Sequence, residues 1–138
     1  MPGIAAAVPM AGYVASLGHT QVAVLAGPES IRGPRRRRDG LVEGLAGQGI
    51  AVPPDRCLHT PIDLAEGRDA TAELLRQVDP PTAILCVSDV LAMGALAAAR
   101  DAGLSVPHEL SVTGFDDADF AAFCTPPLTT VRVPVYQM

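Results

Sequence analysis

The sequence predicts an α/β protein with three layers, α/β/α, built on a mostly parallel sheet of four to five strands. Short apolar runs without alternation, such as Ile84 to Val87, are typical of strands that are buried on both faces, as in a parallel sheet. These runs alternate with stretches of helical periodicity at regular spacing, in the order β-α-β-α-β-α-β. That order favours parallel strands joined by right-handed crossovers, with helices on both faces.

Composition limits the size and the class of the protein. The chain has 138 residues, 49% of them hydrophobic, which is enough for one domain with its own core. It contains no Trp, so the core must consist mainly of Val, Leu, Ile and Ala. The net charge of −5 does not indicate nucleic-acid binding, and every basic residue is Arg.

The cysteines and the N-terminal segment indicate a reduced, cytoplasmic protein. Cys57, Cys86 and Cys124 are odd in number and show no CxxC or zinc spacing, so we expect free thiols, no metal and no cofactor. Residues 1–10 are apolar, but they lack the basic start of a signal peptide and are too short to span a membrane. We expect these residues to form a loose lead, and we expect no membrane partner.

The first half of the chain contains two predicted helices and two predicted strands. A short helix from Met10 to Leu17 should end at Gly18, because glycine commonly follows a helix. The first strand is expected at 21–26 and a weaker strand at 56–60. Between them a helix is predicted from Pro34 to Gln48, with a stripe of Leu41, Val42 and Leu45 facing the sheet and Gly49 ending the helix.

The second half repeats the pattern. Asp63 suits the N-cap of a helix that continues to about Val78, and Asp89 suits the N-cap of the helix Val90–Ala99 that follows the apolar strand 84–87. A further strand is predicted at 110–115, a short helical piece at 118–123, and a last strand at 128–133.

Polar residues follow each predicted strand, and the carboxyl ends of parallel strands share one edge of a sheet. That edge should hold Gly27 to Ser30, Pro61 to Asp63, Ser88-Asp89 and Gly114 to Asp117. Hydroxyls and carboxylates with a nearby arginine suit a neutral polyhydroxylated ligand, because sugar hydroxyls both donate and accept hydrogen bonds. From the sequence alone, capping of helices and turns is the favoured explanation for Ser88, Asp89 and Asp116, and Asp89 can do both.

Four consecutive arginines, Arg35 to Arg38, raise the possibility of a nucleic-acid surface. Successive helix residues lie about 100° apart, so these side chains point in all directions and form no single basic face. Arg36 lies opposite the Leu41/Leu45 stripe and should be solvated. A solvated helix start is therefore favoured over a DNA patch, and periodicity does not select which of the other arginines reaches the ligand edge.

The sequence contains none of the catalytic motifs sought: no GxSxG, no P-loop, no GxGxxG and no HExxH. The histidines His19, His59 and His108 are isolated and are expected to be solvated. A phosphoacceptor pocket at Asp116-Asp117 would also need an acid after the first strand and a lysine, and the chain has neither. The protein is therefore expected not to be an enzyme, and a small α/β enzyme is the least favoured class.

The helix Val90–Ala99 is apolar nearly all round. In a domain of this size one face covers the sheet, and the other also needs a cover, so a subunit interface is one interpretation. Phe120, Phe123 and Cys124 lie near it along the sequence and support that interpretation. A helix that is merely rich in alanine is the alternative.

Several segments together resemble the effector-binding domain of LacI/GalR-family transcriptional regulators, whose fold is the type I periplasmic-binding-protein fold. The match runs from about residue 11 to the end, in the family's order and spacing. The segments are Leu17-Gly18-His19, Val22 to Pro28, Arg37 to Gly40, Pro81 to Ala95, Gly103 to Pro107, Leu110 to Asp117 and Pro126 to Val131.

The resemblance implies binding of a sugar or a similar small molecule between two subdomains. Arg37 is implied as the arginine that clamps the ligand, and Asp116 as the ligand carboxylate. Ser88 stands where the family often has Asn, and Asp89 follows it as in the family. Ile62 falls where many members place an aromatic ring against the sugar.

The resemblance also implies what lies outside this sequence. The family's helix-turn-helix has no counterpart here, so DNA would be a partner only through that missing segment. Residues 11–138 are expected to be the C-terminal effector-binding subdomain. This subdomain would supply one half of the cleft that binds a sugar-like effector, and it is expected to form a homodimer. The equivalent half of a solute-binding protein from a sugar ABC transporter is the alternative.

Overall fold

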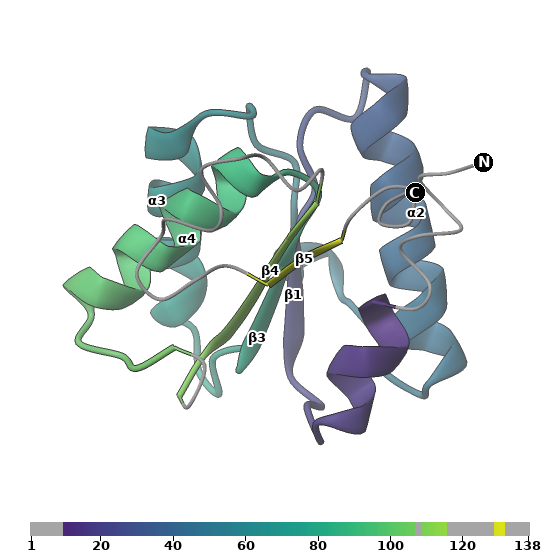
Figure 1. The fold of residues 1–138 in the computed structure, drawn as a ribbon, viewed down its shortest axis with the longest axis horizontal. Helices are drawn as coiled ribbons and strands as arrows, with labels where there is room; N and C mark the ends of the chain where they lie inside the picture. The colour runs from purple at the N-terminus through teal and green to yellow at the C-terminus, as the bar shows by residue number, and fades with distance from the viewer. Residues whose placement is uncertain (1–9, 107–108, 116–128, 132–138) are drawn as a thin grey trace.

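A five-stranded parallel sheet lies between two layers of helices in the computed structural model (Figure 1). The structure describes residues 10–106, 109–115 and 129–131. The strands lie in the order β2-β1-β3-β4-β5, and every pair is parallel. Their bounds are β1 Val22–Leu25, β2 Cys57–Leu58, β3 Ala83–Cys86, β4 Ser111–Phe115 and β5 Thr129–Val131. The predicted fold class is confirmed.

The central strands are buried on both faces, which explains the unbroken apolar sequences of β1 and β3. Every residue of β1, β3 and β4 is buried. Val24 pairs with Leu85 across β1 and β3, and Leu85 pairs in turn with Thr113 of β4. Because both faces are covered by helices, no polar and apolar alternation is needed along these strands.

The helices divide between the two faces of the sheet. Helix α2 (Arg32–Gly47) and the helix over residues 10–16 cover one face, and α3 (Leu64–Leu75) and α4 (Asp89–Asp101) cover the other (Figure 1). A single 3-10 turn, η1 (Pro54–Arg56), leads into β2.

The sheet has a switch point between β1 and β3. The connection through α2 carries the chain from β1 to the edge strand β2, whereas the connection through α4 carries it from β3 to β4 on the opposite side. The connections that leave β1 and β3 thus run in opposite directions, and the carboxyl ends of the strands at such a switch point are the usual ligand position in open α/β sheets.

Helix α2 begins two residues earlier than predicted. Arg32 is its first residue, and Pro34 occupies the first turn, where proline's missing N–H leaves no hydrogen bond unmade. Its predicted end is confirmed. Gly49 has a positive φ of 80°, which glycine adopts without strain, and the amide of Ile50 donates to the Leu45 carbonyl at 2.9 Å.

The N-caps of α3 and α4 are set by side chains. The Asp63 carboxylate accepts from the Ala65 amide at 2.9 Å, as predicted. For α4 the prediction was wrong by one residue: Ser88, not Asp89, is the N-cap, and its hydroxyl accepts from the Val90 amide at 3.0 Å. Asp89 is the first helical residue, where a carboxylate interacts favourably with the helix dipole.

Helices α3 and α4 pack closely through two glycines. A β-carbon built on Gly94 would lie 2.5 Å from the Leu64 carbonyl oxygen and 2.6 Å from the Arg68 amide nitrogen. A β-carbon on Gly67 would lie 2.9 Å from the Leu91 carbonyl oxygen. Contact with α3 and with the sheet buries most of the apolar surface of α4, with eight of its residues buried.

At the amino edge of the sheet, buried polar side chains connect segments that are distant in sequence. Arg56 is only 9% exposed and donates hydrogen bonds to the side chains of Gln21 and Gln77 and to the carbonyls of Val78 and Asp79. His19 bridges two strand starts, with 2.9 Å from Nδ1 to the Thr82 hydroxyl and 3.0 Å from Nε2 to the Ser111 hydroxyl. The expectation of a solvated His19 is therefore wrong.

Some expectations lie outside the described residues: the N-terminal lead, the helical piece at 118–123 with Phe120, Phe123 and Cys124, and His108. The predicted last strand appears as β5, over fewer residues. Within the described ranges, no helix has the length and apolar character needed to cross a membrane.

Candidate ligand-binding edge

Arg37 extends from α2 across the carboxyl edge of the sheet. Its Nη1 donates a hydrogen bond of 3.0 Å to the carbonyl oxygen of Val87, the residue that follows β3. Its guanidinium carbon lies 5.0 Å from the centroid of the Phe115 ring, at the end of β4, within the range of a cation–π contact. The arginine that the resemblance singles out thus lies beside the switch point of the sheet.

The end of β1 forms the other side of this position. Gly27 has a positive φ of 69°, and a β-carbon built on it would lie 3.2 Å from Val87 Cγ2, 3.3 Å from Pro34 Cβ and 3.4 Å from Ile62 Cγ1. Glycine is needed here for both its backbone angle and its small size. Ile62 is 39% exposed and lies beside this turn, so the structure brings it to the same edge as Val87.

Ser88 and Asp89 are buried at the start of α4, with 5% and 2% of their surface exposed. The Ser88 oxygen already accepts from the Val90 amide, so its role as a cap is established, and its hydroxyl proton remains a donor for another group. Burial raises the pKa of the neighbouring Cys86 thiol, and the charge of Asp89 raises it further. Cys86 is therefore an unreactive, buried thiol.

Asp116 lies outside the described residues. In the sequence it directly follows Phe115, the last residue of β4, and β4 is the neighbour of β3. The role of Asp116 as a ligand carboxylate stays a prediction.

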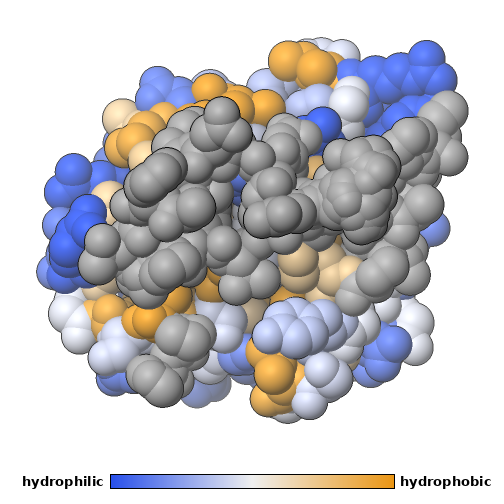
Figure 2. All heavy atoms as spheres, viewed as in Figure 1, coloured by the Kyte–Doolittle hydropathy of each residue, from blue (hydrophilic) through white to orange (hydrophobic). Residues whose placement is uncertain are grey.

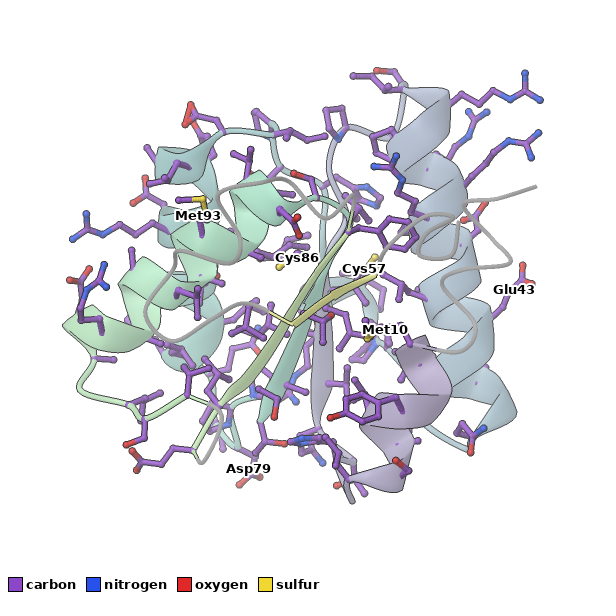
Figure 3. The ribbon with its side chains drawn as sticks, viewed as in Figure 1. Met10, Glu43, Cys57, Asp79, Cys86 and Met93 are labelled. Carbon is purple, nitrogen blue, oxygen red and sulfur yellow. The ribbon has the colours of Figure 1, made fainter. Side chains whose placement is uncertain are left out.

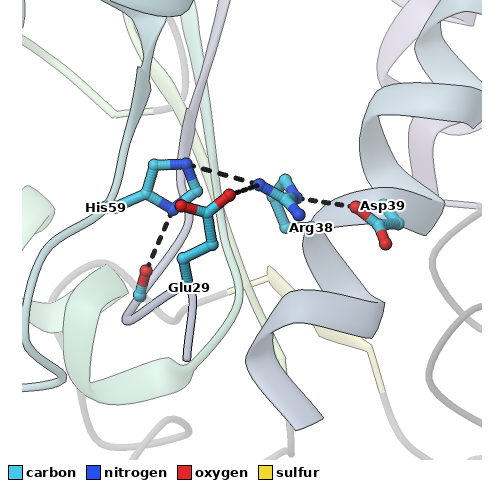
Figure 4. Close-up of polar contacts among 5 residues, drawn as sticks. Glu29, Arg38, Asp39 and His59 are labelled. Carbon is cyan, nitrogen blue, oxygen red and sulfur yellow. Dashed lines mark hydrogen bonds and ion pairs between the residues drawn. The ribbon is translucent and has the colours of Figure 1, made fainter. Parts of the chain in front are cut away.

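Arg38 contacts residues on the β2 side of β1, whereas its neighbour Arg37 contacts residues on the β3 and β4 side. Arg38 forms a network of charged and polar groups (Figure 4). Its Nε donates to the Asp39 carboxylate at 2.7 Å, and its Nη1 lies 3.6 Å from the Glu29 carboxylate and 3.3 Å from Nε2 of His59. His59 Nδ1 lies 3.3 Å from the Gly27 carbonyl oxygen. The carbonyl can only accept, so Nδ1 carries the proton, and Nε2 accepts from Arg38. His59 is exposed as predicted, but it connects β2 to the end of β1.

A pocket of about 470 Å³ lies between α2 and the β2 edge, next to this network. It is lined by Arg38, Asp39, Val42, Glu43, Val52, Pro54, Cys57 and His59. None of the predicted ligand-binding residues lines it. Burial raises the pKa of the Cys57 thiol, an effect that the nearby Arg38 charge partly offsets. Cys57 lies on the α2 side of the sheet and Cys86 on the α3 and α4 side, both as free thiols (Figure 3).

The side chains of the consecutive arginines in α2 do not point in a common direction. Arg32 and Arg35 are exposed, whereas Arg37 and Arg38 are partly buried at different contacts. Figure 2 shows a hydrophilic surface at the upper right, where Figure 1 places one end of α2. Arg36, which was expected to be solvated, is partly buried as well. These positions agree with the prediction that the run forms no single basic face.

No cluster of three or more His, Cys, Asp or Glu side chains suited to a metal ion occurs in the part of the chain that the structure describes. Sequence reasoning missed two partners of Arg37: the Phe115 ring and the Val87 carbonyl. A backbone carbonyl carries no sequence signal. Phe115 was placed at the correct edge, but nothing in the sequence pairs it with an arginine 78 positions earlier.

A parallel sheet with helices on both faces and a switch point places this protein in the class of open α/β folds, in which ligands commonly bind beyond the carboxyl ends of the strands. Comparison with known proteins specifies the family. Residues 11–138 match the model of the periplasmic binding protein-like domain, and this chain belongs to that family.

The relatives that match are transcriptional regulators. The chain is 39% identical to the HTH-type transcriptional repressor CytR of Escherichia coli (strain K12) over 135 residues, and 37% identical to the HTH-type transcriptional regulator DegA of Bacillus subtilis (strain 168). These matches cover 98% and 93% of this chain, but only 40% and 38% of the two relatives. The chain thus spans about two fifths of the length of the regulators that it resembles.

Solved structures agree. A regulatory protein of the LacI family from Chloroflexus aggregans superposes with a TM-score of 0.92 and 34% identity, covering 96% of this chain and 48% of that one. A complex of the transcriptional regulator CelR with cellobiose superposes with a TM-score of 0.88 and 26% identity, covering 94% and 40%. The resemblance to LacI-family regulators is confirmed, and the transporter alternative is not favoured.

Proposed function

We propose that residues 11–138 form the C-terminal effector-binding subdomain of a LacI-type transcriptional regulator, which senses a sugar-like small molecule without catalysing a reaction. The position of Arg37 carries this proposal, because the guanidinium lies across the strand ends beside the switch point. Arg37 would hold ligand oxygens together with Ser88, Asp89 and Asp116, and Ile62 would contact the ligand's apolar face.

The proposal extends to the longer regulator. There the effector would close two subdomains over itself, and this closure would shift an equilibrium between two states at a DNA-binding segment. Such a regulator would act in the cytoplasm as a homodimer and contact DNA only through its helix-turn-helix. The cellobiose complex of CelR supports a carbohydrate as the first class of ligand to test.

Titration calorimetry with a panel of mono- and disaccharides, starting with cellobiose, tests this function in the longer regulator. For a saccharide that binds, Arg37→Ala and Asp116→Ala should each cost about 1.5–3 kcal/mol of affinity, as the loss of charge-assisted hydrogen bonds does. Arg76→Ala is the matched control, because Arg76 is an exposed residue at the end of α3. Unchanged affinity in the two site variants would refute these roles.

The chain of 138 residues should bind saccharides weakly or not at all, since it supplies only part of the proposed contacts. A sub-micromolar dissociation constant for this chain alone would contradict the proposal that it is half of a cleft.

A further inference from the structure

Two contacts of Arg37 come from the ends of two neighbouring strands, β3 and β4. The Val87 carbonyl accepts from Nη1, and the guanidinium carbon lies over the Phe115 ring, 5.0 Å from its centroid. We propose that Phe115 is the positioning residue of Arg37: its ring sets the plane of the guanidinium, so that the arginine is oriented before any ligand arrives.

The ring is well suited to this role because it is itself immobile. Phe115 is 1% exposed and is the last residue of β4, paired with Val131 of β5. Its strand neighbours fix the backbone, and burial restricts the side chain to one packed arrangement. A cation over an aromatic face gains an electrostatic attraction that an aliphatic side chain of similar volume does not offer.

The neighbouring arginine shows a different way of being held. Arg38 is oriented by carboxylates, those of Asp39 and Glu29, and by His59. The contacts of Arg37 include an aromatic face and a backbone carbonyl. The two residues follow each other on α2, so Arg38 is a matched internal control for any measurement on Arg37.

This orientation has a consequence for the class of ligand, which rests on the proposed function. A planar guanidinium fixed in one plane favours a ligand that presents two adjacent oxygen atoms in that plane, such as vicinal hydroxyls. Lysine would provide the charge but neither the flat face nor the paired donors. Arg37→Lys should therefore behave as a loss of the clamp rather than as a conservative change.

Nuclear magnetic resonance of the arginine side chains tests the positioning role without a ligand. Arg37→Lys identifies the Nε–Hε signal of Arg37 by its disappearance. In the unmodified chain this signal should be displaced upfield by the ring and show nuclear Overhauser contacts to the Phe115 ring protons. Phe115→Leu should move it downfield because the ring current is lost, Phe115→Tyr should keep it displaced, and the Arg38 signal should stay unchanged in both variants.

An undisplaced Arg37 signal in the unmodified chain, or one that Phe115→Leu leaves in place, overturns the proposal. If Phe115→Leu does not fold, the nuclear Overhauser contacts of the unmodified chain decide: their presence together with a displaced signal supports the role, and their absence refutes it.

A second arm measures cellobiose binding by the longer regulator. Phe115→Leu should raise the dissociation constant about tenfold, which lies within the range of a cation–π contact, whereas Phe115→Tyr should keep it within about threefold. Phe115→Leu should add nothing in an Arg37→Ala background. If cellobiose does not bind at all, the choice of cellobiose as the effector is wrong, and the magnetic resonance result still decides the role of Phe115. If cellobiose binds and Phe115→Leu leaves its affinity unchanged, the positioning role of Phe115 is refuted.

Discussion

At the scale of single residues, buried polar side chains contribute to stability through the number of partners that they satisfy. Arg56 is the clearest case, because a buried guanidinium has lost its water and must recover its hydrogen bonds inside the protein. Its partners come from the segments before β1 and after α3. One of them, Asp79, has a positive φ of 51°, a backbone angle that non-glycine residues seldom adopt.

Replacing Arg56 by Met should lower the free energy of unfolding by about 2–3 kcal/mol, because Gln21, Gln77 and two carbonyls would lose a charged donor. Urea unfolding followed by circular dichroism measures the change. Arg76→Met, at an exposed position, is the matched control and should change stability by less than about 0.5 kcal/mol. Equal stability of the two variants would mean that the Arg56 hydrogen bonds contribute nothing.

Residue-level roles were only partly predictable from the sequence. Ser88 and Asp89 are both good N-cap residues, and sequence alone does not decide which of two adjacent candidates begins the helix. Arg37 was selected by family resemblance, since periodicity placed four arginines around the helix without ranking them. His19 and Arg56 bind partners up to 92 positions away in sequence, and local patterns carry no information on such pairs.

At the scale of elements, the α3–α4 pair depends on the absence of side chains at two positions. Gly67 and Gly94 lie against the backbone of the opposite helix, which brings the two helices into close contact. Helix α4 is therefore rich in small residues for a packing reason. On the side of α4 that faces α3, the contact between the two helices already covers the apolar surface, so that side needs no partner protein.

Gly94→Ala should lower the free energy of unfolding by about 2–3 kcal/mol, because the new methyl group would overlap backbone atoms of α3 that cannot move aside independently. Gly33→Ala is the same substitution in α2, where nothing lies within 4 Å, and it should be neutral or stabilise by up to about 1 kcal/mol. Thermal unfolding of both variants measures the contrast. A Gly94→Ala protein as stable as the unmodified chain would show that the two helices can separate freely.

The order and type of the elements followed from apolar runs and turn residues, because burial on both faces leaves a clear signal in strands such as 83–86. Boundaries were less predictable. The start of α2 at Arg32 was not predicted for two reasons. Proline fits inside the first turn of a helix as well as at its first residue, and the N-cap residue Ile31 has no capping side chain that would mark the start. The connections through α2 and α4 run from the centre of the sheet toward opposite edges. This strand order depends on tertiary packing, which the sequence pattern does not specify.

At the scale of the whole molecule, His19 makes stability depend on pH at the amino edge of the sheet. Burial lowers the pKa of His19 below its usual value of about 6.5. The unfolded chain therefore takes up the proton at a higher pH than the folded chain does. The stabilisation by neutral His19 is fully present above that usual value and is lost as the pH falls below it.

The free energy of unfolding should thus decrease between about pH 7.5 and about pH 5 more steeply for the unmodified chain than for His19→Gln, which cannot titrate. Urea denaturation across this range measures both slopes. Parallel slopes would exclude His19 as the source of the pH dependence.

Subunit association is a second property of the whole molecule. Met93 on α4 remains partly exposed after α3 and the sheet have covered that helix (Figure 3). If this surface is the dimer interface that we propose, Met93→Glu should give a monomer in sedimentation velocity, because a carboxylate would be buried without a partner. Glu43→Gln on the exposed side of α2 is the control. An unmodified chain that is already monomeric at high concentration removes this interface.

The amino and carboxyl edges of the sheet hold different kinds of side-chain contact. Arg56 and His19 tie strands together at the amino edge, whereas Arg37, Ile62 and Ser88 gather at the carboxyl edge. Substitutions at the proposed ligand contacts therefore lie at the opposite edge of the sheet from the hydrogen bonds of Arg56 and His19. A laboratory selection for new specificity can accordingly diversify strand-end positions other than Gly27 and Ser88 without disturbing those hydrogen bonds, and rescue mutations should arise at the opposite rim.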